Sequence, residues 1–447
     1  MKGLTNVFRQ LKTYPSAVAG LTIIVLLVIM AIYALVTVPY SEAVRLWRGG
    51  DNVWLETPRN ARPAWFNYFY KEKLPVTIVL RTKDDPSLKT IVDLGGGVSV
   101  ADMVLEFDYD YGGGFPTELA VFLTAKYDSA RPNVAMKWIT PDGREIPLAD
   151  LSVRSQETYS ISQDTKLIRR LGGIQAEKGL FADPKNPDKV MKGTYQLVVE
   201  GLVFEEGSTI DASLVVYGQL HGLAGTDHRR RDIMVALLWG TPVALSFGLV
   251  AAVGSSLTTM MLAAAAVWFG GWVDWVIRRI NEVVMILPLL PILIMVGLFY
   301  SRSIWVILGV VILLGIFGSG ILSYRSMFLQ VKESGYIEAA RAYGAGSGRI
   351  IFRYMIPKIV PVLIPGFVTQ VPAFVFLEAT LSVLGLGDPV LPTWGKLLND
   401  AHTNGALFNG YFYWVLEPAL LLIVAGLGFA MLGFALDRIF NPRLRGL

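Results

Sequence analysis

Charged residues are distributed very unevenly along this 447-residue chain, and their distribution limits the folds open to it. Between residues 41 and 220 lie 25 of the 36 acidic residues and 21 of the 40 basic ones. Long uncharged runs occupy much of the rest, among them 13–41 and 233–273. An apolar run of about 20 residues spans the ~30 Å hydrocarbon core of a bilayer. The chain therefore divides into a membrane protein and one inserted soluble domain of roughly 180 residues, which is large enough to bury its own core.

The apolar runs predict six membrane crossings. The first, in 13–41, is too long for a cleaved signal peptide and is expected to remain. The run 233–273 is too long for one simple crossing, so we expect a short interfacial helix at 232–241, a break at Pro242 and a crossing at 243–269. A hairpin that turns at 254–256 is the alternative. The remaining crossings are expected at 283–300, 303–324, 359–377 and 418–436.

Basic residues flank these crossings in the pattern that keeps positively charged loops in the cytoplasm. They lie before the first crossing, between the fourth and fifth crossings and after the last one: Lys2, Arg9, Lys12, Arg325, Lys332, Arg341, Arg349, Arg353, Lys358, Arg438, Arg443 and Arg445. Arg302 and the run 229–231 oppose the pattern, but the run follows a long translocated domain, where the rule has little force. Both termini are predicted to be cytoplasmic and residues 41–220 extracellular.

The inserted segment 41–220 is expected to be mainly β. Apolar and polar residues alternate in 102–111, 119–125 and 195–199, and 141–143 has turn chemistry. Several short strands with turn signals predict an antiparallel sandwich. The stretch 153–192 is less regular, and we expect a long loop or a helical excursion there. Asp108 and Asp110 precede a glycine run, but they lack the further oxygen ligands of a calcium loop and fit the solvated face of a strand better.

The sequence offers little catalytic chemistry. It has no Cys and three His, and it lacks the Gly-x-x-x-x-Gly-Lys-Ser/Thr loop that binds nucleotide phosphates. We therefore predict no catalytic residue, no cofactor, no metal site and no nucleic-acid partner.

A short charged segment between two apolar runs, 325–358, carries the most informative pattern. Four of its residues share one face of a helix by their i, i+3, i+4, i+7 spacing: Tyr336, Ala339, Ala340 and Tyr343. The two alanines let a partner backbone come close, and the tyrosines supply contact area. Gly344 suits the end of this helix, and Pro357 suits the first turn of the next one. On spacing alone, the pattern fits a docking helix and an ordinary amphipathic loop helix equally well.

Several motifs resemble those of the dipeptide/oligopeptide ABC-importer permeases, in particular the second-permease type. Glu338–Gly344 with Ile356–Pro357 resembles the EAA loop of these permeases. The others are, in chain order, Gly225–Asp227 with Arg231–Asp232, Gly270–Asp274, Pro288, Leu381–Gly387, Pro392–Gly395 with Asn399–Ala401, and Asn441–Arg443. Arg230 stands where the family usually has Gly, and Tyr354 and Ile356 replace a His and Leu often found there. The family has a far shorter segment between its first two crossings.

This resemblance implies a type I ABC-importer permease fold, an all-α membrane domain of six transmembrane helices, with 1–40 as the first part, 41–220 as the β-rich insertion and 221–447 as the permease core. The implied ATPase-coupling residues are Tyr336, Glu338, Ala339, Ala340, Arg341, Tyr343, Gly344, Ile356 and Pro357. Glu378 and Pro372 are candidates for the translocation path, with a packing role as the alternative for Glu378. The implied partners are a companion permease, two ATPase subunits, an extracellular solute-binding protein and the lipid membrane.

Other functions stay open at this stage. A membrane-anchored receptor or adhesin would use the helices only as an anchor, and it has no need of the 325–358 pattern. A secondary transporter would need ionisable residues at mid-membrane, which the crossings nearly lack. The resemblance implies a peptide as the solute, with an oligosaccharide or a metal complex as alternatives. For 41–220 we expect either a role in receiving the binding protein or covering the entrance, or a passive cap.

Overall fold

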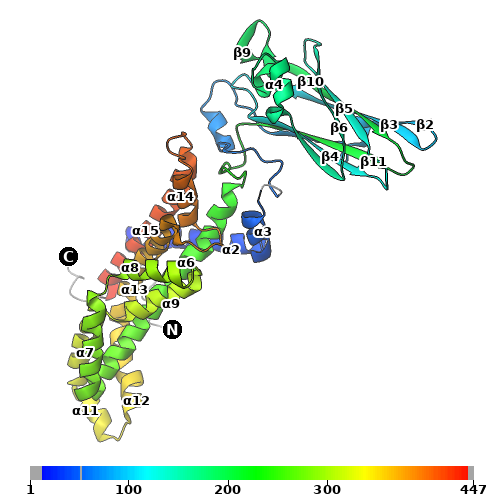
Figure 1. Cartoon of the computed structure of the whole chain (residues 1–447). Coiled ribbons are helices and arrows are strands. Elements are labelled where there is room, and N and C mark those ends of the chain that lie inside the picture. Colours follow the sequence, from blue (N-terminus) through cyan, green and yellow to red (C-terminus); the bar gives the residue numbers. More distant parts are fainter. Residues whose placement is uncertain (1–12, 51–52, 441–447) are drawn as a thin grey trace. The chain divides into compact units, whose positions relative to one another are not determined.

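A computed structural model describes residues 13–50 and 53–440, and the chain forms two compact units (Figure 1). The helical unit comprises Met1–Gly49 and Val235–Leu447, and the inserted unit comprises Gly50–Met234. Some of the residues used above lie outside the described ones: Lys2, Arg9, Lys12, Arg443, Arg445 and the motif Asn441–Arg443.

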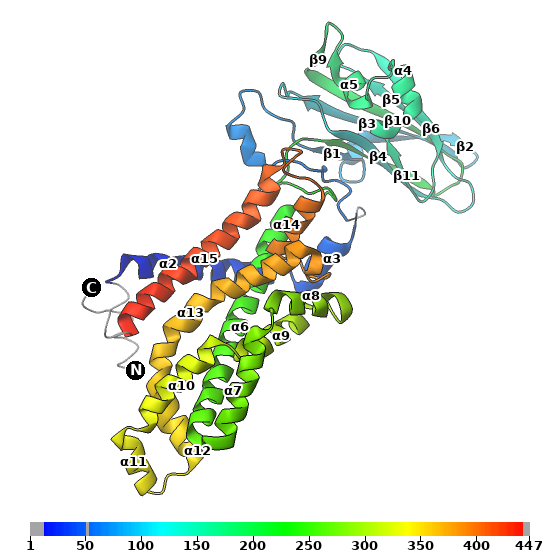
Figure 2. The same ribbon diagram turned by 60° about the vertical axis from the view of Figure 1, so that its left-hand side comes forward.

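The helical unit consists of apolar helices joined by short connections (Figure 2). In chain order they are α2 (Pro15–Thr37), α3 (Tyr40–Arg48), α6 (Ile233–Phe269), α7 (Gly271–Ile286), α8 (Leu289–Phe299), α9 (Ile304–Ile316), α10 (Ser319–Lys332), α11 (Gly335–Ala342), α12 (Ser347–Ile350), α13 (Ile356–Leu381), α14 (Trp394–Thr403) and α15 (Phe412–Phe440).

Four helical segments are long and apolar enough to cross a membrane: α2, α6, the run Ser347–Leu386 that contains α12 and α13, and α15. Two helix pairs meet the same criterion only together, because α7 and α8 meet at 80° and α9 and α10 at 47°. The described residues therefore hold four to six candidate spans, as the predicted helical membrane fold requires.

The helix expected to end at Pro242 is not separate, because α6 runs unbroken from Ile233 to Phe269. This also excludes the hairpin at 254–256. A proline inside a helix disturbs the carbonyls of the preceding turn. The carbonyl that loses its helical partner is that of Leu238; the neighbouring Leu237 O accepts hydrogen bonds from Thr241 Oγ1 (3.1 Å) and Trp394 Nε1 (2.9 Å), which hold this turn against α14. The expected crossing at 283–300 is instead broken at Pro288, between α7 and α8.

Small residues allow α2 to lie close to α15. A Cβ added to Gly20 would be 2.7 Å from Gly428 O, and one added to Gly428 would be 2.7 Å from Ile23 Cγ2. Close backbone approach through small residues is typical of packing between membrane helices. The next helix, α3, also belongs to this unit, since Ala43 and Trp47 are buried and Trp239 Nε1 donates to Val38 O just before it. The inserted unit therefore begins at Gly50 and not at 41.

The inserted unit is built on two antiparallel sheets. One has the strand order β1 (Ile78–Arg81), β11 (Thr209–Tyr217), β4 (Glu118–Lys126), β7 (Gln156–Ser160). The other has the order β2 (Lys89–Gly95), β3 (Val98–Tyr109), β10 (Gly193–Val203), β5 (Asn133–Ile139), β6 (Glu145–Ser152). One hydrophobic core joins residues of both sheets, as in a sandwich. The predicted alternation is observed in β3, where Met103, Leu105 and Phe107 are buried and Glu106 is exposed.

The less regular stretch 153–192 holds β7, the helices α4 (Thr165–Arg170) and α5 (Ala176–Phe181), and the small hairpin of β8 (Ala182–Asp183) and β9 (Asn186–Val190). Phe181 of α5 is fully buried and stacks on Tyr195 with ring centroids 4.5 Å apart. Asp108 and Asp110 are engaged across the sheet, with Thr194 Oγ1 at 2.6 Å and Lys192 Nζ at 2.8 Å.

Candidate functional site

The segment between α10 and α13 forms a compact turn of two short helices, α11 and α12. Glu338 lies in the first turn of α11 and Arg341 in the last, the placement that suits the helix dipole. Gly344 ends the helix with φ of +77°, a conformation that favours glycine. Ala345 N then donates to Ala340 O at 3.0 Å, which closes the helix end. The sequence therefore builds a short, well-terminated helix, as predicted.

One face of α11 is fixed to the membrane helices. Ile337 is fully buried and Ala340 is 8% exposed, and both pack in a cluster with Val267 of α6, Phe328 of α10 and Met355. The prediction that Ala340 shares one face of the helix with Tyr336, Ala339 and Tyr343 is therefore wrong, because those three residues are exposed and Ala340 is buried. The reason is geometric: Ala340 lies three residues after Ile337, on the side of α11 that turns toward this cluster.

The opposite face of α11 is open. Tyr336 is 41% exposed and Tyr343 is 92% exposed, and Ala339 between them is also exposed. Glu338, Arg341 and Gly344 are exposed beside this face. A small residue between two large exposed tyrosines gives a surface that a partner can approach closely and bury well. We call Tyr336, Ala339 and Tyr343 the outer face of α11.

Three polar contacts tie this region to its neighbours, and the sequence pattern did not assign them. The guanidinium of Arg341 lies over the ring of Trp268, 4.5 Å from the centroid. Lys332 Nζ donates to Val267 O at 2.6 Å, where α6 ends. Arg325 of α10 binds both carboxylate oxygens of Asp274 in α7 at 2.8 Å. Asp274 belongs to the Gly270–Asp274 motif, and this motif was the only sequence feature that pointed to a role for Asp274.

The other predicted coupling residues lie at the start of α13. Pro357 is exposed in the first turn of that helix, and Ile356 is half-buried against the same cluster as Ile337. A π-helical turn, Ile351–Met355, joins α12 to α13 without a loop. The outer face of α11 is thus followed closely by a long membrane helix.

Glu378, a candidate for the translocation path, is buried in a closely packed region between α13 and α14. Its Oε1 accepts a hydrogen bond from Ser382 Oγ at 2.8 Å, and the residue is 4% exposed. A Cβ added to Gly395 would be 2.6 Å from Ser382 Cβ, so α14 approaches this turn with no space to spare. These contacts favour a packing role for Glu378.

The helical unit contains a cavity of about 370 Å³. Its lining comes from α6, α7, α8, α9, α10 and α13 and from the connections between them, and it includes neither Glu378 nor Pro372. The polar lining groups are neutral, and they are Ser255, Ser256, Thr259, Ser319, Tyr324 and Gln370. The cavity is therefore a better candidate for a solute path than either predicted residue.

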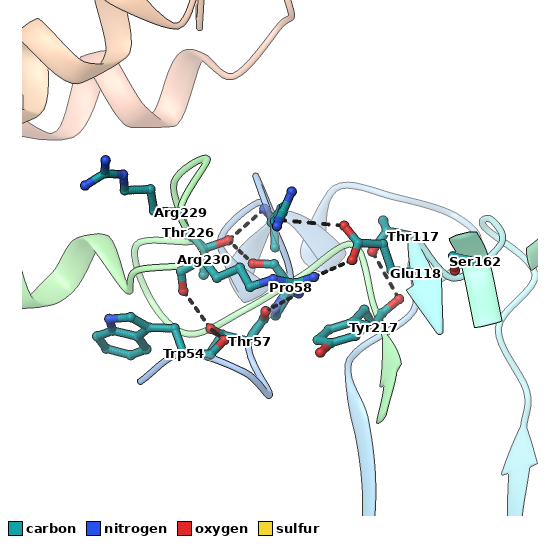
Figure 3. A network of polar contacts seen from close by, with 12 residues as sticks. Trp54, Thr57, Pro58, Thr117, Glu118, Ser162, Tyr217, Thr226, Arg229 and Arg230 are labelled. Atoms are coloured by element: carbon teal, nitrogen blue, oxygen red, sulfur yellow. Dashed lines mark hydrogen bonds and ion pairs between the residues drawn. The ribbon is translucent and has the colours of Figure 1, made fainter. Parts of the chain in front are cut away.

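In the inserted unit, the chain segments 57–62 and 219–231 lie side by side and form what we call the neck (Figure 3). Arg62 N donates to Gln219 O at 2.9 Å and Asn60 N donates to Asp227 O at 3.1 Å. Thr226 Oγ1 donates to Pro58 O at 2.7 Å and accepts from Ala61 N at 2.9 Å. The neck joins the entry and exit of the inserted unit into one element.

Two arginines secure the neck. Arg231 Nη2 lies 2.6 Å from Asp227 Oδ2, in an ion pair with both side chains at least 96% buried. Arg230 pairs with Glu118, donates to Thr57 O at 2.8 Å and covers the ring of Tyr217. Burial raises the pKa of the Tyr217 hydroxyl to about 12, and this hydroxyl donates to Leu55 O.

The family description "binding-protein-dependent transport system inner membrane component" matches residues 255–446, and "N-terminal TM domain of oligopeptide transport permease C" matches residues 4–56. A dipeptide transport system permease protein of Alkalihalophilus pseudofirmus is 31% identical over 229 residues, which cover 49% of this chain and 72% of that protein. The chain belongs to the binding-protein-dependent transport permeases.

Other relatives agree with this membership. A dipeptide transport system permease protein of Bacillus subtilis is 29% identical over 222 residues, covering 49% of this chain and 68% of that protein. A glutathione transport system permease protein of Pectobacterium atrosepticum is 29% identical over 229 residues, covering 49% and 72%. Membership of this family implies that the chain acts together with an ATPase and a substrate-binding protein.

Neither family description covers residues 57–254, which include most of the inserted unit. The motif Gly225–Asp232 falls within this gap, and it forms one side of the neck. This permease therefore carries a family-like motif whose side chains are engaged with an insertion.

Proposed function

We propose that this chain is the permease subunit of an ATP-driven importer that takes up peptides or similar small solutes. One observation carries the proposal: α11 is fixed to the membrane helices by one face and leaves a small-residue face with two flanking tyrosines open. That arrangement suits a helix held between a moving partner and a membrane gate. The relatives named for dipeptide and glutathione transport support a peptide-like solute.

Force applied at the outer face of α11 has a short route into the membrane helices. Ile337 and Ala340 contact the buried cluster that contains residues of α6, α10 and α13. Arg341 contacts Trp268 at the end of α6, and Lys332 contacts the carbonyl of Val267 beside it. We propose that docking of the ATPase subunit on Tyr336, Ala339 and Tyr343 moves these helices as a group, with Glu338, Arg341 and Gly344 at the edge of the contact and Ile356 and Pro357 passing the motion to α13.

The neutral cavity is the proposed solute path within this chain. Hydroxyl and amide groups, such as those of Ser256, Thr259 and Gln370, match the hydrogen-bonding groups of a peptide backbone without attracting one net charge. A companion permease would supply the other wall of the path. The chain, two ATPase subunits and that companion form the proposed complex.

The inserted unit is proposed to lie outside the cell, with both termini of the chain in the cytoplasm. There it would receive the solute-binding protein or cover the solute entrance. A passive cap remains the competing role. The neck suggests how to separate them: Arg62 and Gln219 are directly hydrogen-bonded, so a short Gly/Ser linker can replace residues 64–217 while keeping both neck segments. Unchanged uptake and unchanged stimulation of ATP hydrolysis by the loaded binding protein would show a passive cap.

The decisive experiment reconstitutes the chain with its companion permease, ATPase and binding protein in liposomes and measures uptake of labelled peptides. We expect uptake that requires ATP and is lost in a Tyr343→Ala variant. If no ATPase subunit co-purifies with the chain and no solute accumulates, the helices act only as an anchor and a receptor function replaces the importer.

A further inference from the structure

The exposed aromatic residues of the inserted unit are concentrated in one short loop. Among the described residues of that unit, the exposed aromatic residues are Trp65 (40%), Tyr68 (89%), Phe69 (79%) and Tyr70 (42%). Leu223, whose carbonyl accepts from Trp65 Nε1 at 3.0 Å, is 68% exposed. We call residues 64–74 the aromatic loop. Such a concentration of apolar surface marks an interaction site.

The aromatic loop is held in one conformation, so its exposed side chains are not the result of a loose segment. Asn67 closes it by pairing with both backbone groups of Leu74, at 2.9 and 3.2 Å. Arg62 Nη1 donates to Tyr70 Oη at 2.8 Å. Gly113 N donates to Lys73 O, and a Cβ on Gly113 would be only 2.6 Å from Glu72 O. The loop therefore rests on the glycine run 112–114, which explains why glycine occupies that run.

The loop is also fixed close to the start of α6. Ala64 N donates to Gly222 O at 2.9 Å, and Ile233 N, the first residue of α6, donates to Gly225 O at 3.1 Å. These bonds and the two peptide steps from Leu223 to Gly225 place Trp65 Nε1 at most roughly 15 Å from the beginning of α6. With a rise of 1.5 Å per residue, α6 is about 55 Å long, whereas a bilayer with its headgroups measures about 40–45 Å. α6 is therefore long enough to cross the bilayer with its first turn at the headgroup level.

We propose that the aromatic loop rests on the lipid headgroups of the bilayer, beside the point where α6 enters it. Trp and Tyr favour this interface because their rings are apolar and their N–H and O–H groups are polar. Lys71 and Lys73 follow the aromatic residues and are exposed, so they can meet lipid phosphates. The inserted unit is then supported by the membrane itself as well as by its chain connections. This contact requires only that α6 spans the membrane, whatever solute is carried.

The chain has no Cys, so single-cysteine spin labels can test the contact without background. A label at Phe69 in the assembled transporter in nanodiscs is compared with a label at Leu94. Leu94 is a matched control because it is also apolar and 62% exposed, but it lies beside the start of β3, roughly 35 Å along that strand from its end near the aromatic loop. The measured quantity is the ratio of accessibility to oxygen, which enters lipid, over accessibility to a water-soluble nickel chelate.

We expect this ratio to be several-fold higher for the label at Phe69 than for the label at Leu94. In a Phe69-labelled protein that also carries Tyr68→Ser, we expect the ratio to be lower than with Tyr68 present. Equal ratios at the two positions, both typical of water, would overturn the proposal. A Phe69 label shielded from both reagents would also overturn it, because that result indicates a protein partner on the loop.

Discussion

The guanidinium of Arg230 lies over the ring of Tyr217, 4.3 Å from its centroid. Arg230 has a φ of +65°, a conformation that suits glycine, and glycine is what the resembled family usually has there. The arginine replaces it and reaches Glu118, Thr57 and Tyr217, all within the inserted unit. The departure from the family motif at this position is therefore explained by the insertion: a strained backbone is kept because its side chain secures the neck.

Replacing Arg230 separates the strain from the contacts. The Arg230→Ala variant loses the side-chain contacts to Glu118, Thr57 and Tyr217 but keeps the positive φ. Because Glu118 then lacks its closest partner, we expect the free energy of unfolding to fall by about 1–3 kcal/mol. Arg230→Gly loses the same contacts but relieves roughly 1 kcal/mol of backbone strain. Thermal unfolding of the full chain in detergent should rank wild type above Gly and Gly above Ala. A Gly variant less stable than the Ala variant would contradict this account.

Substitutions on the two faces of α11 should have different effects. Tyr343→Ala removes a side chain that is 92% exposed, so stability should change by less than about 0.5 kcal/mol while transport and co-purification of the ATPase fall sharply. Ala340→Asp places a charge in the buried cluster, and we expect both transport and thermal stability to fall. Solute uptake and melting temperature, measured on the same preparations, distinguish the two. Normal uptake by the Tyr343→Ala variant would remove the outer face of α11 from the coupling contact.

The ion pair of Asp274 with Arg325 should hold α7 against α10. Asp274→Asn leaves the arginine with a neutral acceptor, and we expect a loss of about 1–2 kcal/mol, since both side chains are only partly buried. A double-mutant cycle with Arg325→Met should give a coupling energy well above zero. Additive effects of the two single changes would show that the pair contributes little.

The turn at 128–130 should depend on pH through Glu205. This carboxylate accepts hydrogen bonds from the Ser129 hydroxyl and from the backbone N–H groups of Asp128, Ser129 and Ala130, which lower its pKa from 4.5 to about 2. The folded state thus binds fewer protons than the unfolded one, so the stabilisation is complete above about pH 4.5 and is lost as the pH falls toward 2. Amide exchange of Ser129 and Ala130, corrected for intrinsic rates, should accelerate over that range. A Glu205→Gln variant should lack this pH dependence.

Thiol labelling can test the orientation of the chain in the membrane. A single Cys at Asp142, in an exposed turn of the inserted unit, should react in intact cells with a reagent that does not cross membranes. A single Cys at Arg349, exposed in the segment after α11, should react only after the membrane is opened. Reaction of both positions from outside would contradict the proposed topology.

Much of the fold followed from the sequence because its signals are local. Uncharged runs gave the membrane helices, and two-residue alternation in 102–111 gave β3 with its buried face. The local sequence pattern gave wrong predictions where a residue far away in the sequence determines the local structure. α6 continues through Pro242, a residue that usually interrupts a helix, in a turn that Trp394 contacts from α14 through Leu237 O.

The candidate site shows the same limit. Helical spacing placed Tyr336, Ala339 and Tyr343 together correctly, but it could not tell that the cluster of Val267 and Met355 covers the side on which Ala340 lies. Trp268, Asp274 and Arg325 were not assigned because each depends on a residue at least 51 positions away. The neck was missed for the same reason, since Asn60 and Asp227 belong to opposite ends of the insertion.

The cavity of about 370 Å³ is lined entirely by uncharged residues. A solute in transit would meet no fixed charge from this wall, so acidic, basic and neutral cargoes of equal bulk would be treated alike by it. On the proposed path, discrimination among them would fall to the other wall and to the protein that delivers the solute. If this cavity is the solute path as proposed, this wall would not oppose a delivery protein that brings a solute of different charge.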